Sequence, residues 1–142
     1  MGLKNIRFLA GDIEKMPSEA HQFDVVIYNC VLNLVPDKTR AFAEIKRVLK
    51  PKGHFCVSDV VIKGDLPENL REDAEMYTNC IAGALQMEEY LEIIRQTGFN
   101  TIKVHKQKRI ELPEKILKKY VPENKRKDFT NEDKGIEEIK NQ

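Results

Sequence analysis

The chain has 142 residues, the size of one domain, and a domain of this length buries roughly two-thirds of its unfolded surface. Charged residues make up 33% of the chain, yet the net charge is only +1, so no global field favours nucleic acid or a membrane surface as a partner. We expect neither a membrane span nor a signal peptide, because no apolar run is long enough and the N-terminal residues lack the signal pattern.

The cysteines indicate the redox environment. Cys30, Cys56 and Cys80 are odd in number and widely spaced. A disulfide framework uses even numbers of cysteines, so this pattern predicts free thiols in a reducing compartment, the cytoplasm. The three histidines lack the spacing of metal ligands, and a zinc site is not expected.

The first predicted strand is Ile6–Ala10, and a polar loop from Gly11 to Gln22 follows it. Phe23–Tyr28 is a run of apolar and β-branched residues with almost no alternation. Such a run is typical of a strand buried on both faces, as in a parallel sheet covered by helices.

A helix and a second strand follow. Pro36 fits the first helical position, and Pro51 with Gly53 ends the helix and turns the chain. Its apolar residues recur at helical spacing and form one stripe: Ala41, Phe42, Ile45, Val48 and Leu49. His54–Ile62 then returns to a strand. Strand, helix and strand predict a right-handed parallel βαβ unit.

The carboxyl ends of the two strands define the functional edge, because ligands of open α/β sheets bind there. Asn29 and Cys30 follow the first strand of the unit, and Asp59 lies near the end of the second. We expect Asp59 to order the turn after its strand. Cys56 lies in the middle of the second strand and is expected to pack in the core.

The second half of the chain alternates between helical and extended patterns. The predicted elements are a helix beginning at Pro67, a helix over Met87–Thr97, an edge strand over Thr101–Leu112 and a short helix over Pro113–Tyr120. From residue 122 the apolar content falls. We therefore expect a domain over residues 1–121 and a charged, weakly ordered tail over residues 122–142.

Several short motifs resemble those of class I S-adenosylmethionine-dependent methyltransferases. These motifs are Gly11-Asp12-Ile13-Glu14 with Met16-Pro17, Asn29-Cys30-Val31 with Asn33-Leu34, Pro36-Asp37-Lys38, and Arg47-Val48-Leu49-Lys50-Pro51. The segment Asn79–Leu85 is similar to the second cysteine segment of the arsenite methyltransferases, which are the subgroup that the chain resembles most. The order of the two cysteine segments is more specific than the Arg47–Pro51 block, which many methyltransferases carry.

The resemblance implies a fold, a cofactor and a site. The fold would be α/β and Rossmann-like, with a mostly parallel sheet and helices on both faces. S-adenosylmethionine would be the cofactor, with Asp12 accepting a hydrogen bond from the adenine amino group, Ile13 packing on the ring, and Asn29 touching the amino-acid end. Cys30 and Cys80 would be the catalytic residues and would bind trivalent arsenic, a soft substrate that prefers thiolates.

Less specific interpretations stay open for each of these residues. Free cysteines usually pack as small apolar side chains. Asp12 can cap a turn of its loop, and the side chain of Asn29 can hydrogen bond to the backbone of the loop after its strand. The basic run Lys103–Arg109 is interpreted as a solvated strand face and not as a nucleic-acid surface.

One expected motif is missing from the sequence. The family holds the methionine end of its cofactor with a glycine-rich turn, and none of the seven glycines lie close enough together to form it. We therefore expect only the C-terminal part of the fold, without its first two strands, and an incomplete cofactor site. Two functions follow as hypotheses: part of a methyltransferase for arsenite or another soft small molecule, or a truncated, non-catalytic module. The module would act through a partner or form a homodimer through an open sheet edge.

Overall fold

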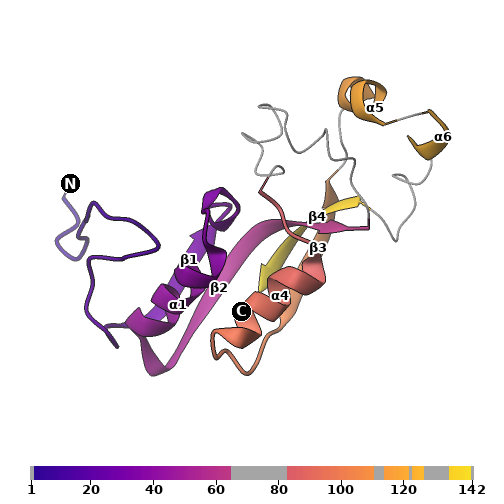
Figure 1. Cartoon of the computed structure of the whole chain (residues 1–142). Coiled ribbons are helices and arrows are strands. Elements are labelled where there is room, and N and C mark those ends of the chain that lie inside the picture. Colours follow the sequence, from indigo (N-terminus) through magenta and orange to yellow (C-terminus); the bar gives the residue numbers. More distant parts are fainter. Residues whose placement is uncertain (1, 65–82, 111–113, 122, 127–134, 142) are drawn as a thin grey trace.

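The protein is built around a four-stranded sheet in the order β1-β2-β4-β3 (Figure 1). The computed structural model describes residues 2–64, 83–110, 114–121, 123–126 and 135–141. The strands are β1 (Phe23–Asn29), β2 (Leu49–Lys63), β3 (Val104–Ile110) and β4 (Gly135–Asn141). The helices are α1 (Lys38–Val48), α4 (Met87–Gln96), α5 (Glu114–Tyr120) and α6 (Glu123–Arg126), and a short 3-10 helix, η1, covers Leu32–Leu34.

The βαβ unit predicted from the sequence is present. β1 and β2 pair in parallel, with Ile27 opposite Cys56. Asp37 caps α1, because its carboxylate accepts a hydrogen bond of 2.9 Å from the amide of Arg40. The helix ends at Val48 and the chain enters β2 directly at Leu49.

The prediction of a mostly parallel sheet is wrong for the described strands. β4 is antiparallel to both of its neighbours, β2 and β3, so the β1·β2 pair is the one parallel pairing among three. β4 lies within residues 122–142, the segment that was expected to be a charged, weakly ordered tail. Its sequence, GIEEIKN, is too charged to be recognised by hydrophobic pattern, whereas its place in the sheet comes from backbone pairing on both sides.

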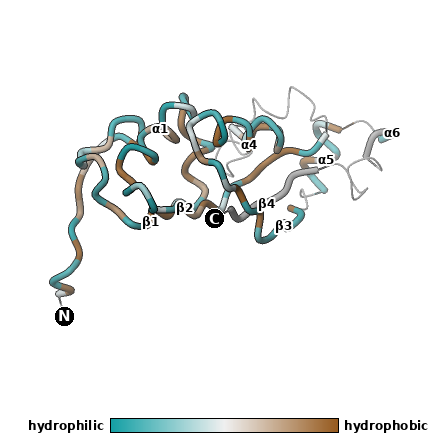
Figure 2. Tube along the Cα trace, turned by 90° about the horizontal axis from the view of Figure 1, so that it is seen from below, coloured by the Kyte–Doolittle hydropathy of each residue, from teal (hydrophilic) through white to brown (hydrophobic). Residues whose placement is uncertain are grey.

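The prediction of helices on both faces is also wrong within the described part of the chain. α1 and α4 lie side by side over one face of the sheet (Figure 2), where the rings of Phe42 and Tyr90 meet edge to face at 5.7 Å. The opposite face of β1 carries Phe23, Val25 and Ile27, whose exposed fractions are 38%, 42% and 74%. β1 is therefore not buried on both faces, as its apolar sequence had suggested.

The core lies between the two helices and the sheet. Its fully buried members include Leu32, Phe42, Ile45, Val61, Tyr90 and Ile94. Burial of an aliphatic or aromatic side chain contributes roughly 1.5–3 kcal/mol, so this one-sided core is the main stabilising contact of the described residues.

The segment before β1 has no regular strand. Ile6–Ala10, expected to be a strand, runs as irregular chain, and Phe8 is 92% exposed. A strand needs a hydrogen-bonding neighbour, and this segment does not pair with β1. No helix in the described ranges is both long and apolar enough to cross a membrane.

Candidate functional site

Cys30 lies at the carboxyl edge of the sheet, immediately after β1. Its φ is +53°, in the left-handed region, and its amide donates a 2.8 Å hydrogen bond to the carbonyl of Ser58 in β2. This bond fixes the turn that leaves the strand and leads into η1. The thiol is partly buried. The edge position expected from the sequence is therefore confirmed for Cys30.

The loop after Cys30 is held by buried polar contacts. Asn33 is 2% exposed, and its side-chain amide donates to the carbonyl of Val60 in β2 at 2.7 Å. Lys38, in the first turn of α1, donates from Nζ to the carbonyl of Val35 at 3.1 Å. The loop therefore has hydrogen-bond partners in both β2 and α1, through the side chain of Asn33 and the carbonyl of Val35, and these contacts fix the surroundings of Cys30.

The end of the second cysteine segment reaches the same loop. Gly83 packs so closely on Asn33 that a Cβ atom at Gly83 would collide with the Asn33 carbonyl. Cys80 itself lies outside the described residues, as does the helix predicted to begin at Pro67. The meeting of the two thiols therefore stays a prediction, and the described chain brings their segments together at Gly83 and Asn33.

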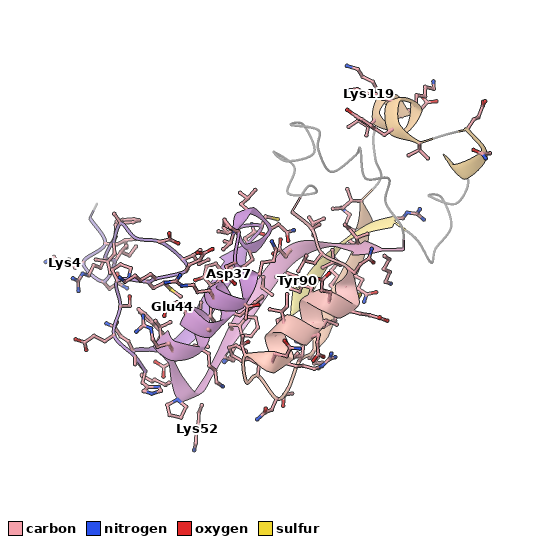
Figure 3. All side chains as sticks on the ribbon, viewed as in Figure 1. Lys4, Asp37, Glu44, Lys52, Tyr90 and Lys119 are labelled. Carbon is pink, nitrogen blue, oxygen red and sulfur yellow. The ribbon has the colours of Figure 1, made fainter. Side chains whose placement is uncertain are left out.

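Beneath this loop lies a buried pair that sequence reasoning missed. Asp59 is fully buried inside β2, not in a turn after it, and its Oδ2 accepts a 3.0 Å hydrogen bond from the hydroxyl of Tyr90. Tyr90 extends from α4 toward the sheet (Figure 3). Burial raises the pKa of Asp59 to about 6, against opposing effects of the Val60 amide, Tyr90 and Lys38. The sequence does contain a signal for this buried residue, because the carboxylate of Asp59 interrupts the apolar run VSDVVI.

The loop before β1 forms one wall of a hollow of about 310 Å³. Asp12 and Ile13 line it from the loop, and Tyr28 and Val31 line it from either side of Asn29 and Cys30. The predicted pair Asp12 and Ile13 is thus brought next to the cysteine edge. Asn29 is exposed and does not line the hollow.

The hollow fits one end of the expected cofactor. Apolar side chains such as Ile13 and Val31 suit a flat ring, and the carboxylate of Asp12 suits an exocyclic amine. Oδ1 of Asp12 accepts a hydrogen bond from the amide of Glu14 at 2.9 Å, which is the turn-capping contact of the less specific interpretation, and the contact with adenine stays a prediction.

Comparison with known proteins identifies the class. The methyltransferase domain family model matches residues 1–98, so the chain belongs to the methyltransferase domain family. Related proteins include the arsenite methyltransferases of Halobacterium salinarum, 35% identical over 101 residues, and of Homo sapiens, 39% identical over 100 residues. These alignments cover 71% and 67% of this chain, but only 26% of each relative.

Solved structures agree with this assignment. An arsenic(III) S-adenosylmethionine methyltransferase from Chlamydomonas reinhardtii is 30% identical, with a TM-score of 0.70 over 92% of this chain and 41% of that protein. A putative methyltransferase from Bacillus halodurans, at 16% identity and a TM-score of 0.69, shows the same fold. The α/β, Rossmann-like class expected from the sequence is confirmed, with the corrections to the sheet given above. The family is one that uses S-adenosylmethionine.

Proposed function

We propose that this chain forms part of an S-adenosylmethionine-dependent methyltransferase that acts on arsenite or another soft small molecule. The single observation that carries the proposal is the close packing of Gly83 on Asn33, which brings the segment that follows Cys80 to the loop that follows Cys30. The relationship to arsenite methyltransferases supports the choice of substrate class.

Methyl transfer needs little acid–base catalysis from the protein. The cofactor supplies an electrophilic methyl group on a sulfonium, and an electron-rich nucleophile needs mainly to be held in line with it. Cys30 and Cys80 would hold trivalent arsenic through their thiolates, since soft ions select sulfur ligands. Asp12 and Ile13 would bind the adenine ring. Two sulfur ligands should bind arsenic less tightly than three.

The test is the arsenite affinity of the native chain against Cys30→Ser and Cys80→Ser. Both variants should bind at least tenfold more weakly, because each loses one sulfur ligand. Cys56→Ser is the matched control, since Cys56 lies within β2 and should leave the affinity unchanged. Equal arsenite affinity in all four proteins would leave these cysteines with a packing role and refute the proposal.

A second candidate function has its own observation. β1 is an edge strand whose outer face exposes Phe23, Val25 and Ile27. An open strand edge is a template for pairing with another chain. A two-fold pairing of β1 with β1 of a second copy, centred on Val25, would place Phe23 opposite Ile27 and keep the apolar face continuous. We propose this homodimer as the alternative, a non-catalytic module.

A further inference from the structure

One ion pair on α1 holds the wall of the hollow. Glu44 and Arg47, one turn apart, bond each other twice, from Nε to Oε1 at 2.7 Å and from Nη2 to Oε2 at 2.8 Å. We call these two side chains the Glu44–Arg47 clamp. A bidentate pair of this kind fixes the orientation of both side chains, which a single ionic contact does not.

The clamp also hydrogen bonds to main-chain groups of the loop before β1. Oε2 of Glu44 accepts the amide of Met16 at 2.8 Å. Arg47 donates from Nη1 to the carbonyl of Ser18 at 2.8 Å and from Nη2 to the carbonyl of Met16 at 3.1 Å. Met16 and Ser18 line the hollow, so the pair fixes the position of that wall.

The other end of α1 holds the same loop. The amide of Asp37, the residue that caps the helix, donates to Oε1 of Glu14 at 2.9 Å. A carboxylate at a helix N-terminus also complements the helix dipole. Figure 3 shows Glu44 on α1 and Asp37 at the N-terminal end of this helix, and both residues hydrogen bond to the loop before β1. The loop is therefore fastened at two points, one near each end of a rigid helix.

Electrostatics keep the clamp charged at neutral pH. The hydrogen bond from Arg47 holds the pKa of the Glu44 carboxyl below its usual range. The Glu44 side chain is only 17% exposed, so water competes weakly for its oxygens. Glu92 and Arg95 on α4 form an ion pair of the same spacing at 3.4 Å, but 53% and 56% of their side chains are exposed.

We infer that Glu44 and Arg47 are positioning residues for a purine ring: they set the affinity of the hollow for adenosine without touching the ligand. The inference rests on the proposed function, because it takes the hollow between Asp12 and Tyr28 as the adenine site. Its physical basis is pre-organisation. A wall that is already fixed does not have to be ordered when the ring binds.

The experiment titrates the full chain with adenosine and follows binding by NMR. Arg47→Gln and Glu44→Ala should each raise the dissociation constant of adenosine about tenfold, the effect of losing charge-assisted hydrogen bonds. Arg47→Lys keeps the charge but not the planar fork, and should fall between native and Arg47→Gln. Arg95→Gln removes the matched ion pair on α4 and should bind adenosine as the native chain does.

A second measurement separates positioning from general loss of stability. Amide hydrogen exchange at Met16 should accelerate in Glu44→Ala, whereas exchange at Val26, whose amide lies on the side of β1 that pairs with β2, should stay at the native rate. Native adenosine affinity in Arg47→Gln and Glu44→Ala would overturn the inference and leave the proposed function standing. A native chain that binds no adenosine would overturn both this inference and the proposed function. Accelerated exchange throughout β1 would also overturn the inference, since the clamp would then be a general stabilising contact.

Discussion

Gly83 lies directly against the backbone carbonyl of Asn33, with no space for a side chain between them. Asn33 is buried and anchored to β2 through Val60. The glycine is therefore required by a close approach of two main-chain segments and not by an unusual backbone angle. This contact links the end of the second cysteine segment to the Cys30 loop.

Gly83→Ala should loosen that link. The added methyl group meets a backbone atom that cannot rotate away, so we expect a loss of about 1–3 kcal/mol in the free energy of unfolding. Arsenite affinity should fall with it. Chemical denaturation and arsenite titration measure the two effects. Gly2→Ala is the control, because nothing lies within 4 Å of a Cβ at Gly2. Native stability in Gly83→Ala would contradict this packing.

Asp59→Asn should change how stability depends on pH. The pKa of Asp59 rises from 3.8 to about 6 on folding, so the folded state binds a proton where the unfolded state has released it. The free energy of unfolding therefore falls by about 3 kcal/mol in total as pH rises from well below 3.8 to well above 6, and most of this loss occurs between these two values. The asparagine variant lacks this loss and should become more stable than the native chain above pH 6.

Urea denaturation at pH 4, 5, 6 and 7.5 measures this difference. Asp24→Asn serves as the control, since Asp24 is an exposed carboxylate paired with Lys50. Parallel pH profiles for native and Asp59→Asn would contradict the burial of an ionisable Asp59.

Adenosine and S-adenosylmethionine should bind this chain with similar, weak affinity. The hollow provides Asp12 and Ile13 for the adenine, whereas no glycine-rich turn occurs in the sequence to hold the methionine end. Calorimetry should give dissociation constants within about threefold of each other, both well above the low micromolar range, which corresponds to about −8 kcal/mol. A low micromolar value for S-adenosylmethionine would show that another part of this chain holds the methionine end.

Ile27→Lys should abolish self-association if β1 pairs with a second copy. Ile27 is 74% exposed on the outer face of the edge strand, and a charge there opposes edge-to-edge pairing. Light scattering across a concentration series should show a native dimer and a monomeric variant. His105→Lys, on the opposite edge strand β3, should remain dimeric. A native chain that stays monomeric at high concentration would exclude this dimer.

The sequence predicted the elements that carry strong patterns. The apolar stripe from Ala41 to Val48 and the run beginning at Phe23 were sufficient to predict the parallel βαβ unit and the position of Cys30. β4 could not be found in the same way, because its charged residues do not alternate with apolar ones. The role of Asp59 was missed for a related reason: its partner Tyr90 is 31 residues away, and only the packing of α4 brings them together.

The position of β4 has a consequence for synthesis on the ribosome. Residues 135–141 pair with β2 on one side and β3 on the other, so these two strands have no direct pairing with each other. During vectorial translation, β1 and β2 can pair early, while β3 must wait for a strand made about 25 residues later. Such non-local pairing is slow and leaves strand edges exposed to aggregation. The four-stranded sheet can therefore be completed only after residues 135–141 have been made.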